Sequence, residues 1–325
     1  MQNSSESNDG YHQTELLNRL DQANTAIMIA AGVITFPPAL FTYFRVLTVS
    51  DFKNEFLLKL FVLNGFANFL IYIINIFEMQ FINWPSTYHI YKWLRDTPIP
   101  LFFRFLQDFS YSLMWQTTFF ISLNRYLCIQ YIRVMKRNAL KYFTFSCSVS
   151  FIVAAVVAFP LFFSGFTYKE IELDDGQLAH YPTYRNKQYL EIPATYHQNF
   201  ISFVTLIVNV LIVIKFNELR QDIGENSKMK GKPEHGLLIS SILMFLIHLV
   251  QTILLIIHPF APHFLLTLSI PLLITLATTV PFWTLIGFAH SLRRTILNGT
   301  PLHNRREMTV TFSANVTNQR TSDIV

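Results

Sequence analysis

The chain has 325 residues, of which 51% are hydrophobic and only 14% charged, whereas soluble domains carry charges at about 25% of positions. The net charge of +5 is small, and the charged residues are mixed with apolar blocks, which excludes a nucleic-acid-binding protein. The 32 Phe and 14 Tyr exclude a disordered chain, and two Cys exclude a disulfide-rich scaffold. These properties indicate an integral membrane protein.

Apolar stretches long enough to cross a bilayer recur along the whole chain. A bilayer core of about 30 Å needs about 20 apolar residues in helical conformation. Seven stretches reach that length: Ala26–Leu47, Phe56–Phe77, Pro98–Leu123, Tyr142–Phe163, Ala194–Ile214, Leu237–Ile257 and Phe264–Phe288. Buried helices of a soluble protein imitate one or two such runs but not seven. The sequence therefore predicts an all-α membrane protein, a seven-transmembrane helix bundle.

The distribution of basic residues predicts the orientation of this bundle. The segments after the first, third, fifth and seventh spans, with the span ends, hold 18 of the 25 Lys and Arg. By the positive-inside rule the N-terminus lies outside and the C-terminus is cytoplasmic. We expect an extracellular segment at 1–22, a transmembrane domain at 23–290 and a cytoplasmic tail at 291–325. The polar stretch before Ala26 lacks the basic and apolar regions of a signal peptide.

Two kinds of modification site bear on this orientation. Asn3 begins an Asn-Ser-Ser glycosylation acceptor on the expected outer side. Cys128 and Cys147 fall in the inner halves of the third and fourth spans, where they are not placed for an extracellular disulfide. We expect both to be free thiols, with palmitoylation of Cys128 as an alternative.

Short motifs at the span ends carry a family resemblance. The third span closes with Ser122–Tyr126, which resembles a variant of the Asp-Arg-Tyr motif of G-protein-coupled receptors. The longer phrase Phe120–Arg125, the second-span stretch Leu60–Asn68 and the stretch from Val280–Trp283 to Ser291–Arg294 resemble nematode serpentine chemoreceptors of the class gamma family or a close relative. This resemblance implies a chemosensory receptor without a cofactor, at the plasma membrane and in a sensory cilium. Its implied partners are an odorant or pheromone-like small molecule outside, a heterotrimeric G protein inside and membrane lipid.

Several positions depart from the better-known rhodopsin-like receptors. The second span has Asn64 and Asn68 but no Asp, and the seventh has Pro281 without an Asn-Pro-x-x-Tyr pattern. The sixth span has no internal Pro, and no outer cysteine ties the third span to the second outer loop. These departures argue against a vertebrate-type amine or peptide receptor and favour the divergent nematode group.

The inner end of the third span is the candidate G-protein contact, made by Asn124, Arg125 and Tyr126. The resemblance implies that Arg125 contacts the C-terminal helix of the G protein in the active state. Asn124 cannot form the ion pair that Asp would form, so it holds Arg125 through a hydrogen bond worth roughly 1.5–3 kcal/mol. The alternative is a basic flank that only sets topology.

The outer half of the third span is the candidate ligand site. Arg104, Asp108, Tyr111 and Trp115 recur at helical spacing on one face. Asp108 precedes Arg125 by 17 residues, a rise of about 26 Å. Charged groups at this depth face the bundle interior or water. Two roles remain open for Arg104 and Asp108, namely ligand contact and a structural ion pair.

Polar residues of other spans are further candidate ligand contacts. They are His197 in the fifth span and His248 with Gln251 in the sixth, with Glu78, Tyr196 and Thr267 as additional polar groups. Each is also explained by a hydrogen bond between helices. No cluster has metal-ligand spacing. The second outer loop, 165–193, mixes acidic and aromatic residues, which suits either a cap or an ordinary solvated loop.

Two other functional classes compete with a receptor. A ligand-gated channel or transporter is the alternative, but insect odorant receptors are oriented with the N-terminus inside, and the inverted repeats of transporters are not visible. An intramembrane enzyme would need a catalytic motif such as paired aspartates, whereas Asp108 stands alone in its span. We therefore expect a receptor and no enzymatic activity.

Overall fold

A computed structural model of the chain describes residues 5–48, 56–83, 85–172, 178–185 and 188–223, scattered positions between 239 and 253, and 263–288. Its long helices follow the predicted spans. In chain order the main elements are α1 (Ser5–Thr48), α2 (Phe56–Asn75), α3 (Tyr88–Arg95), α4 (Ile99–Gln130), α5 (Ile132–Ala158), β1 (Phe166–Glu172), β2 (Leu178–Tyr184), α6 (Gln188–Ile223) and α8 (His263–Phe288).

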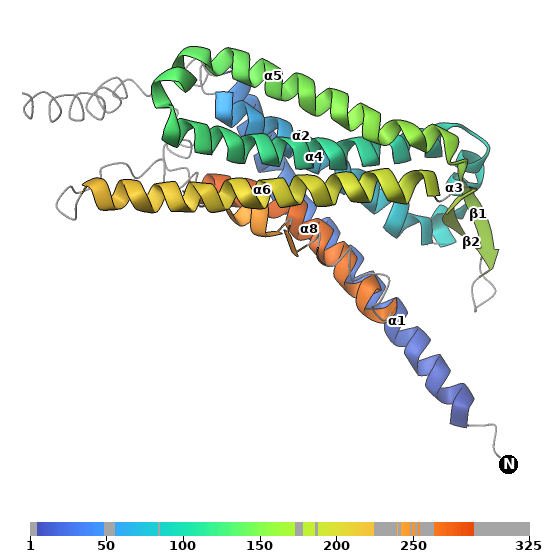
Figure 1. The fold of residues 1–325 in the computed structure, drawn as a ribbon. Coiled ribbons are helices and arrows are strands. Elements are labelled where there is room, and N and C mark those ends of the chain that lie inside the picture. The colour runs from blue at the N-terminus through green and yellow to red at the C-terminus, as the bar shows by residue number, and fades with distance from the viewer. Residues whose placement is uncertain are drawn as a thin grey trace, which may run out of the picture.

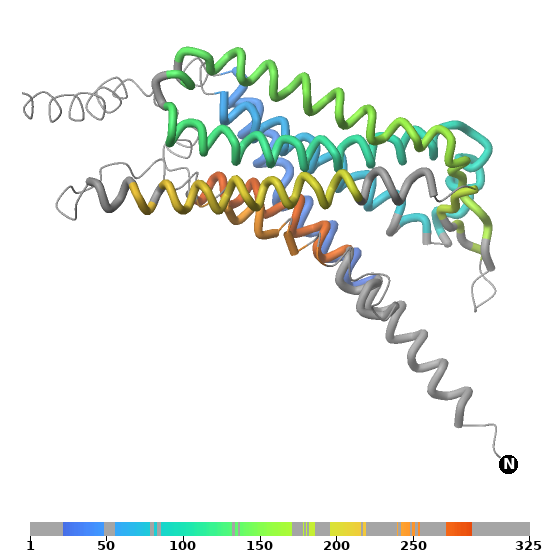
Figure 2. The backbone as a smooth tube through the Cα atoms, in the orientation of Figure 1, coloured from blue at the N-terminus to red at the C-terminus, as the bar shows by residue number. Residues whose placement is uncertain are grey.

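Helix α4 occupies the centre of the bundle. It packs against α2, α5 and α6, while α1 runs beside α8 on another side of the molecule (Figure 1). The backbone trace shows the same arrangement, with α3 and the β1–β2 hairpin gathered at one end of the long helices (Figure 2). Polar side chains on α4 are therefore close to several neighbouring helices at once.

Four helices of the described part are long and apolar enough to cross a membrane. They cover Gln22–Thr48, Phe56–Glu78, Arg137–Phe163 and Tyr196–Lys215, and Pro271–Gly287 is a shorter apolar helix. Helix α4 is less apolar because it carries Arg104 and Asp108 inside its length. Most of the predicted sixth span, Leu237–Ile257, lies outside the described residues.

The helix ends differ from the predicted span ends in a consistent way. Helix α4 continues to Gln130 instead of ending at Leu123, and α6 begins at Gln188 instead of Ala194. Hydropathy marks the part of a helix that suits lipid, whereas backbone hydrogen bonds continue into the polar flanks. Helix α2 ends in a π-helical turn, Ile76–Gln80, which places Glu78 at the bundle end near α3.

The contact between α1 and α2 depends on two glycines that face tyrosines. Gly32 of α1 lies against the ring of Tyr72, and Gly65 of α2 lies against the ring of Tyr43. Both tyrosines are buried, and the Tyr72 hydroxyl donates a hydrogen bond to the carbonyl of Met28. A Cβ at either glycine would overlap the facing ring, so these positions set the closest approach of the two helices.

We expect Gly65→Ala to destabilise the protein. The new methyl group must displace the buried Tyr43 ring, and overpacking of this kind costs about 1–3 kcal/mol. Gly287→Ala is the matched control, because nothing lies within 4 Å of its added Cβ and Ala is the better helix former by about 1 kcal/mol. Thermal unfolding of the purified full chain measures both variants, and equal melting temperatures would contradict the packing interpretation.

Candidate functional site

A chain of polar contacts crosses from α4 to α2 at the end of the bundle where α3 and the β1–β2 hairpin lie, which is the predicted outer end. The guanidinium of Arg104 lies 3.3 Å from the Asp108 carboxylate and donates to the Gln107 side chain at 2.5 Å. Gln107 donates to Asn75 of α2 at 3.0 Å, and Asn75 donates to the Tyr111 hydroxyl at 3.1 Å. The structure thus brings Arg104, Asp108 and Tyr111 together on one face of α4, and Arg104 and Asp108 form an ion pair, which was one of the two roles left open for them.

Helix α3 and the β1–β2 hairpin cover this polar centre. The strands are antiparallel, with Phe166 paired to Tyr184 and Glu172 to Leu178. Phe166 and Tyr168 are buried against Tyr91 and Leu94 of α3, because alternate residues of a strand point to the same face. Gly165 precedes β1 at φ 65°, a conformation that glycine adopts without strain. We call α3 and the hairpin the cap.

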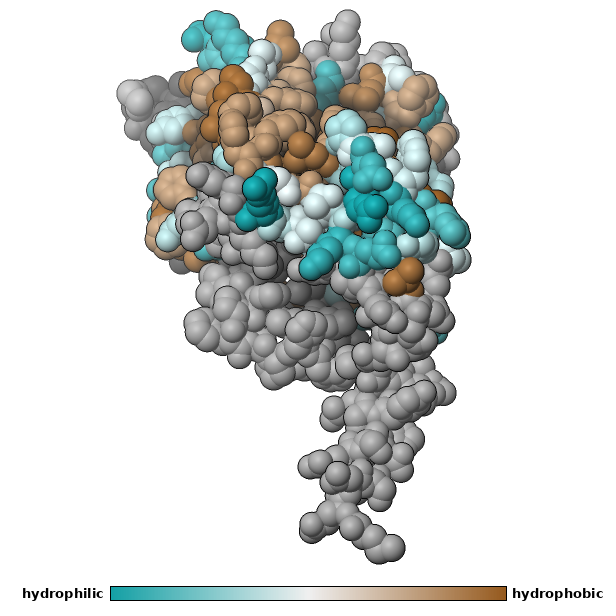
Figure 3. Space-filling view, turned by 90° about the vertical axis from the view of Figure 1, so that its right-hand side faces the viewer, coloured by the Kyte–Doolittle hydropathy of each residue, from teal (hydrophilic) through white to brown (hydrophobic). Residues whose placement is uncertain are grey.

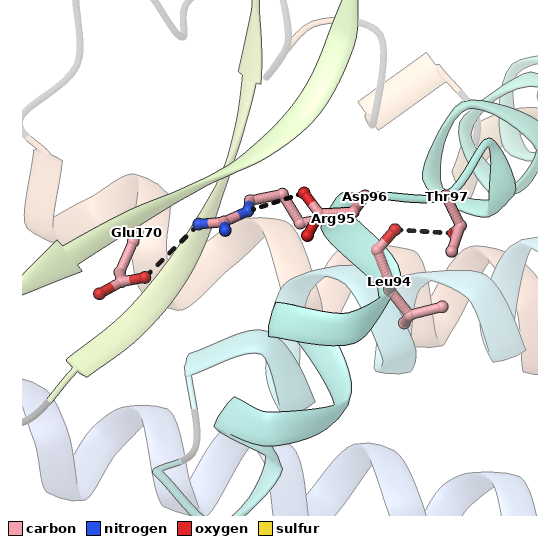
Figure 4. Close-up of polar contacts among 5 residues, drawn as sticks. All are labelled: Leu94, Arg95, Asp96, Thr97 and Glu170. Atoms are coloured by element: carbon pink, nitrogen blue, oxygen red, sulfur yellow. Dashed lines mark hydrogen bonds and ion pairs between the residues drawn. The ribbon is translucent and has the colours of Figure 1, made fainter.

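Side-chain contacts hold the cap to the bundle and hold its two parts together. The Tyr168 hydroxyl donates to Glu78 at 3.4 Å, and the Arg104 guanidinium lies 5.7 Å from the centre of the Tyr184 ring. Arg95 at the end of α3 pairs with Glu170 at 3.5 Å and with Asp96 at 3.3 Å (Figure 4). Burial and the nearby Glu78 carboxylate raise the pKa of Tyr168, so its hydroxyl stays protonated and donates.

The outer surface of this end mixes hydrophilic and hydrophobic patches, as the end-on view shows (Figure 3). Neither Cys128 nor Cys147 forms a disulfide, and no described residue of the cap is a cysteine. The described contacts that hold the cap are therefore noncovalent.

His180 of β2 is a buried titratable group of the cap. The imidazole is fully buried against Tyr88, with ring centres 4.9 Å apart. Burial is the main cause that lowers the pKa of His180, and Arg95 and Lys92 lower it further, against the opposing effect of Glu170. The folded cap therefore favours the neutral ring.

Acidification should loosen the cap. Because the unfolded imidazole takes up a proton at about pH 6.5 and the folded one only at lower pH, the His180 contribution to stability is present above that pH and is lost as pH falls below it. Hydrogen exchange of 166–184 at pH 7.5 and 5.5 measures this, with His180→Phe as the control. The same acid response in wild type and His180→Phe would refute the assignment.

The remaining predicted ligand contacts lie deeper or outside the described residues. Trp115 is buried in an apolar cluster with Leu113, Ile201 and Ile274, and Tyr111 packs against this cluster from the side of the ion pair. His197 of α6 contacts Gln116 of α4, with 2.6 Å between their Nε2 atoms. His248, Gln251 and the glycosylation candidate Asn3 lie outside the residues whose side chains the structure describes.

Buried amides of α2 tie it to the middle of α4. The Asn64 side-chain amide lies 3.0 Å from the Met114 carbonyl, 2.9 Å from the Thr117 hydroxyl and 3.1 Å from the Thr118 hydroxyl. Asn68 donates to Asn64 at 3.0 Å. Asn64 therefore has a structural role between the two helices, and Asn68 holds the Asn64 side chain from within α2.

The other end of α4 carries the predicted G-protein contact. Asn124 is buried, and the Cys128 thiol points to its side-chain oxygen at 4.0 Å. Arg125 and Tyr126 are half-buried. One turn earlier Asn209 of α6 donates to Ser122 at 3.2 Å, which joins α4 and α6 next to this motif.

Sequence reasoning did not single out Gln107, Asn75 or Gln116 as members of these contacts. A signal was present, because an amide inside an apolar span must find a hydrogen-bond partner. The partner itself depends on which residues of α2 and α6 face α4. Among the described residues no group of three or more His, Cys, Asp or Glu is placed to hold a metal ion.

Comparison with known proteins places this geometry in a fold. No family model and no curated protein matches the sequence. Among solved structures, the chain is similar to the crystal structure of squid rhodopsin, with a TM-score of 0.62 and 12% sequence identity over 85% of each chain. The chain thus has the fold of rhodopsin, and the predicted seven-helix fold class is confirmed. It is a multi-pass membrane protein.

Proposed function

We propose that the protein is a G-protein-coupled chemosensory receptor of the plasma membrane, of the nematode serpentine type. It binds a small extracellular molecule and activates a heterotrimeric G protein, and it has no enzymatic activity. The observation that carries this proposal is the pairing of a receptor fold with two polar centres at opposite ends of α4. One surrounds Arg104 and Asp108 beneath the cap, and the other is the Asn124–Tyr126 motif.

The outer centre is the proposed ligand site. Arg104, Asp108 and Tyr111 form its floor, and His197 with Gln116 lies further along the same helix toward α6. Trp115, His248 and Gln251 remain proposed contacts. The ligand shifts the receptor toward its active state only by binding that state more tightly than the inactive one. Contacts between α4, α2 and α6 connect the ligand site to the inner end.

Nucleotide exchange tests the proposal. The full chain in lipid nanodiscs is incubated with a panel of purified heterotrimeric G proteins, and GTP uptake is compared with that in empty nanodiscs. We expect basal exchange to rise above the empty-disc rate with at least one heterotrimer. No acceleration with any heterotrimer, together with an ion conductance in lipid bilayers, would support the channel alternative instead.

A further inference from the structure

The cap covers the carboxyl group of Glu78. Among the described residues this carboxyl group forms no salt bridge with a Lys or Arg side chain. Glu78 is 3% exposed, and the hydrogen bond to its carboxyl comes from Tyr168, a neutral donor. A carboxylate removed from water is stable only when a positive charge compensates it or a proton neutralises it. The charge around Glu78 therefore decides what this end of the bundle can bind.

The nearby charges do not balance. Beneath the cap, Glu78 contacts Tyr168 of the hairpin, and Arg104, which pairs with Asp108, contacts Tyr184 of the same hairpin. The Arg104 guanidinium forms an ion pair with Asp108 at 3.3 Å and donates a hydrogen bond to the Gln107 side-chain oxygen at 2.5 Å. The centre therefore contains one cation, Arg104, and two carboxyl groups, those of Asp108 and Glu78. It carries one negative charge in excess when both carboxyl groups are ionised.

Aromatic rings pack beside the Glu78 carboxyl group. Tyr168, which bonds to Glu78, packs against Tyr91 with 5.4 Å between ring centres, and Tyr91 packs against Phe77 at 5.2 Å. Aromatic faces attract ammonium groups through their quadrupoles, and a carboxylate beside them adds a full countercharge. This combination of groups suits an organic cation better than an anion or a neutral molecule.

A second observation points to a missing partner in the same cluster. His180 is 0% exposed, its ring lies 6.4 Å from that of Tyr91, and neither ring nitrogen has a hydrogen-bond partner among the residues that the structure describes. Buried polar groups in folded proteins are nearly always hydrogen-bonded. A neutral imidazole has one acceptor nitrogen, and the N–H of an ammonium group can donate to it.

We propose that the ligand is a small organic cation, an amine or ammonium compound with one positive charge, whose charge is matched by Glu78. Tyr91 and Tyr168 supply the aromatic faces, and His180 accepts a hydrogen bond from the cation. The inference rests on the proposed receptor function, because it assigns a ligand class to the same outer site. Glu78 is then a specificity-determining residue, in addition to Arg104 and Asp108.

The excess negative charge can be measured without knowing the ligand. The full chain carries Tyr184→Cys in a background in which Cys128 and Cys147 are replaced by Ser, so that the only thiol lies in the cap beside Arg104. Two membrane-impermeant methanethiosulfonates of similar size are applied from outside, one with a trimethylammonium group and one with a sulfonate. The measured quantity is the rate of modification by the cationic reagent divided by the rate of modification by the anionic reagent. It is compared in three proteins, in which position 78 is unchanged or carries Glu78→Gln or Glu78→Asp.

We expect Glu78→Gln to lower this ratio about tenfold or more, since a charge at short range in a partly buried site changes local ion concentrations by that amount. Glu78→Asp should keep most of the ratio, and Glu218→Gln, on the exposed side chain that pairs with Lys215, should keep all of it. An unchanged ratio in Glu78→Gln would show a neutral carboxyl and overturn the proposal. Absence of reaction with both reagents would overturn it too, because the site would be closed to small cations.

These results are independent of G-protein coupling. A charge-selective site in a chain that never accelerates nucleotide exchange would leave the cation site standing and remove the receptor function. Nucleotide exchange activity together with an unchanged modification ratio would remove the cation site and leave the receptor function standing.

Discussion

Arg125→Ala should abolish G-protein activation while surface expression persists. Arg125 lies half-buried at the inner end of α4, next to buried Asn124. A guanidinium at the boundary between lipid and cytosol is stable where it snorkels or bonds to polar groups at the inner ends of the helices. In the proposed active state it provides the contact with the G protein. Receptor-stimulated nucleotide exchange and cell-surface labelling measure the two effects separately.

Arg137→Ala is the matched control for Arg125→Ala. Arg137 is an exposed basic residue near the start of α5, on the same side of the membrane in the predicted topology. If basic residues at this side only set topology, the two variants should behave alike. Full signalling by Arg125→Ala would contradict the proposed G-protein contact.

Arg104→Met should lower the free energy of unfolding by about 2–4 kcal/mol, somewhat less than for a fully buried pair, because removal of one member of this partly buried pair leaves its partner uncompensated. In this chain both Asp108 and Glu78 would lose the nearby guanidinium. The double variant Arg104→Met/Asp108→Leu should recover much of this loss. Reversible unfolding of the purified chain in detergent measures each variant.

Asp108→Asn separates the two roles that the ion pair leaves open. Arg104 retains Gln107 as an acceptor in this variant, so we expect a small loss of stability and a larger change in ligand potency. Collapse of expression would show that the pair is mainly structural.

For the first pair of variants, equal stability losses in Arg104→Met and in the double variant Arg104→Met/Asp108→Leu would refute the coupling between the two residues.

The long helices could be predicted from the sequence because lipid requires an apolar span of fixed length. The first, second, third, fourth, fifth and seventh predicted spans all fall on described helices. The spacing of Arg104 and Asp108 likewise predicted their contact, since residues four apart share one face of a helix. Local periodicity was sufficient in both cases.

The cap and the amide contacts could not be predicted in the same way. The alternation of apolar and polar residues in 166–172 is short and includes Lys169 and Glu170, so it resembles a solvated loop until β2 is paired beside it. The contact from Gln107 to Asn75 depends on the relative rotation and height of α4 and α2. Helix packing, not local sequence, fixes those quantities.

The receptor proposal depends most directly on the side of the membrane that each end of the chain occupies. A glycosylation reporter fused before Met1 and a cytosolic reporter fused after Val325 measure this in one full-length protein. We predict a glycosylated N-terminal reporter and an active cytosolic reporter, which would exclude a channel with an inside N-terminus. An inside N-terminus would contradict the charge-based orientation, the cytoplasmic position of Arg125 and the outward-facing ligand site together.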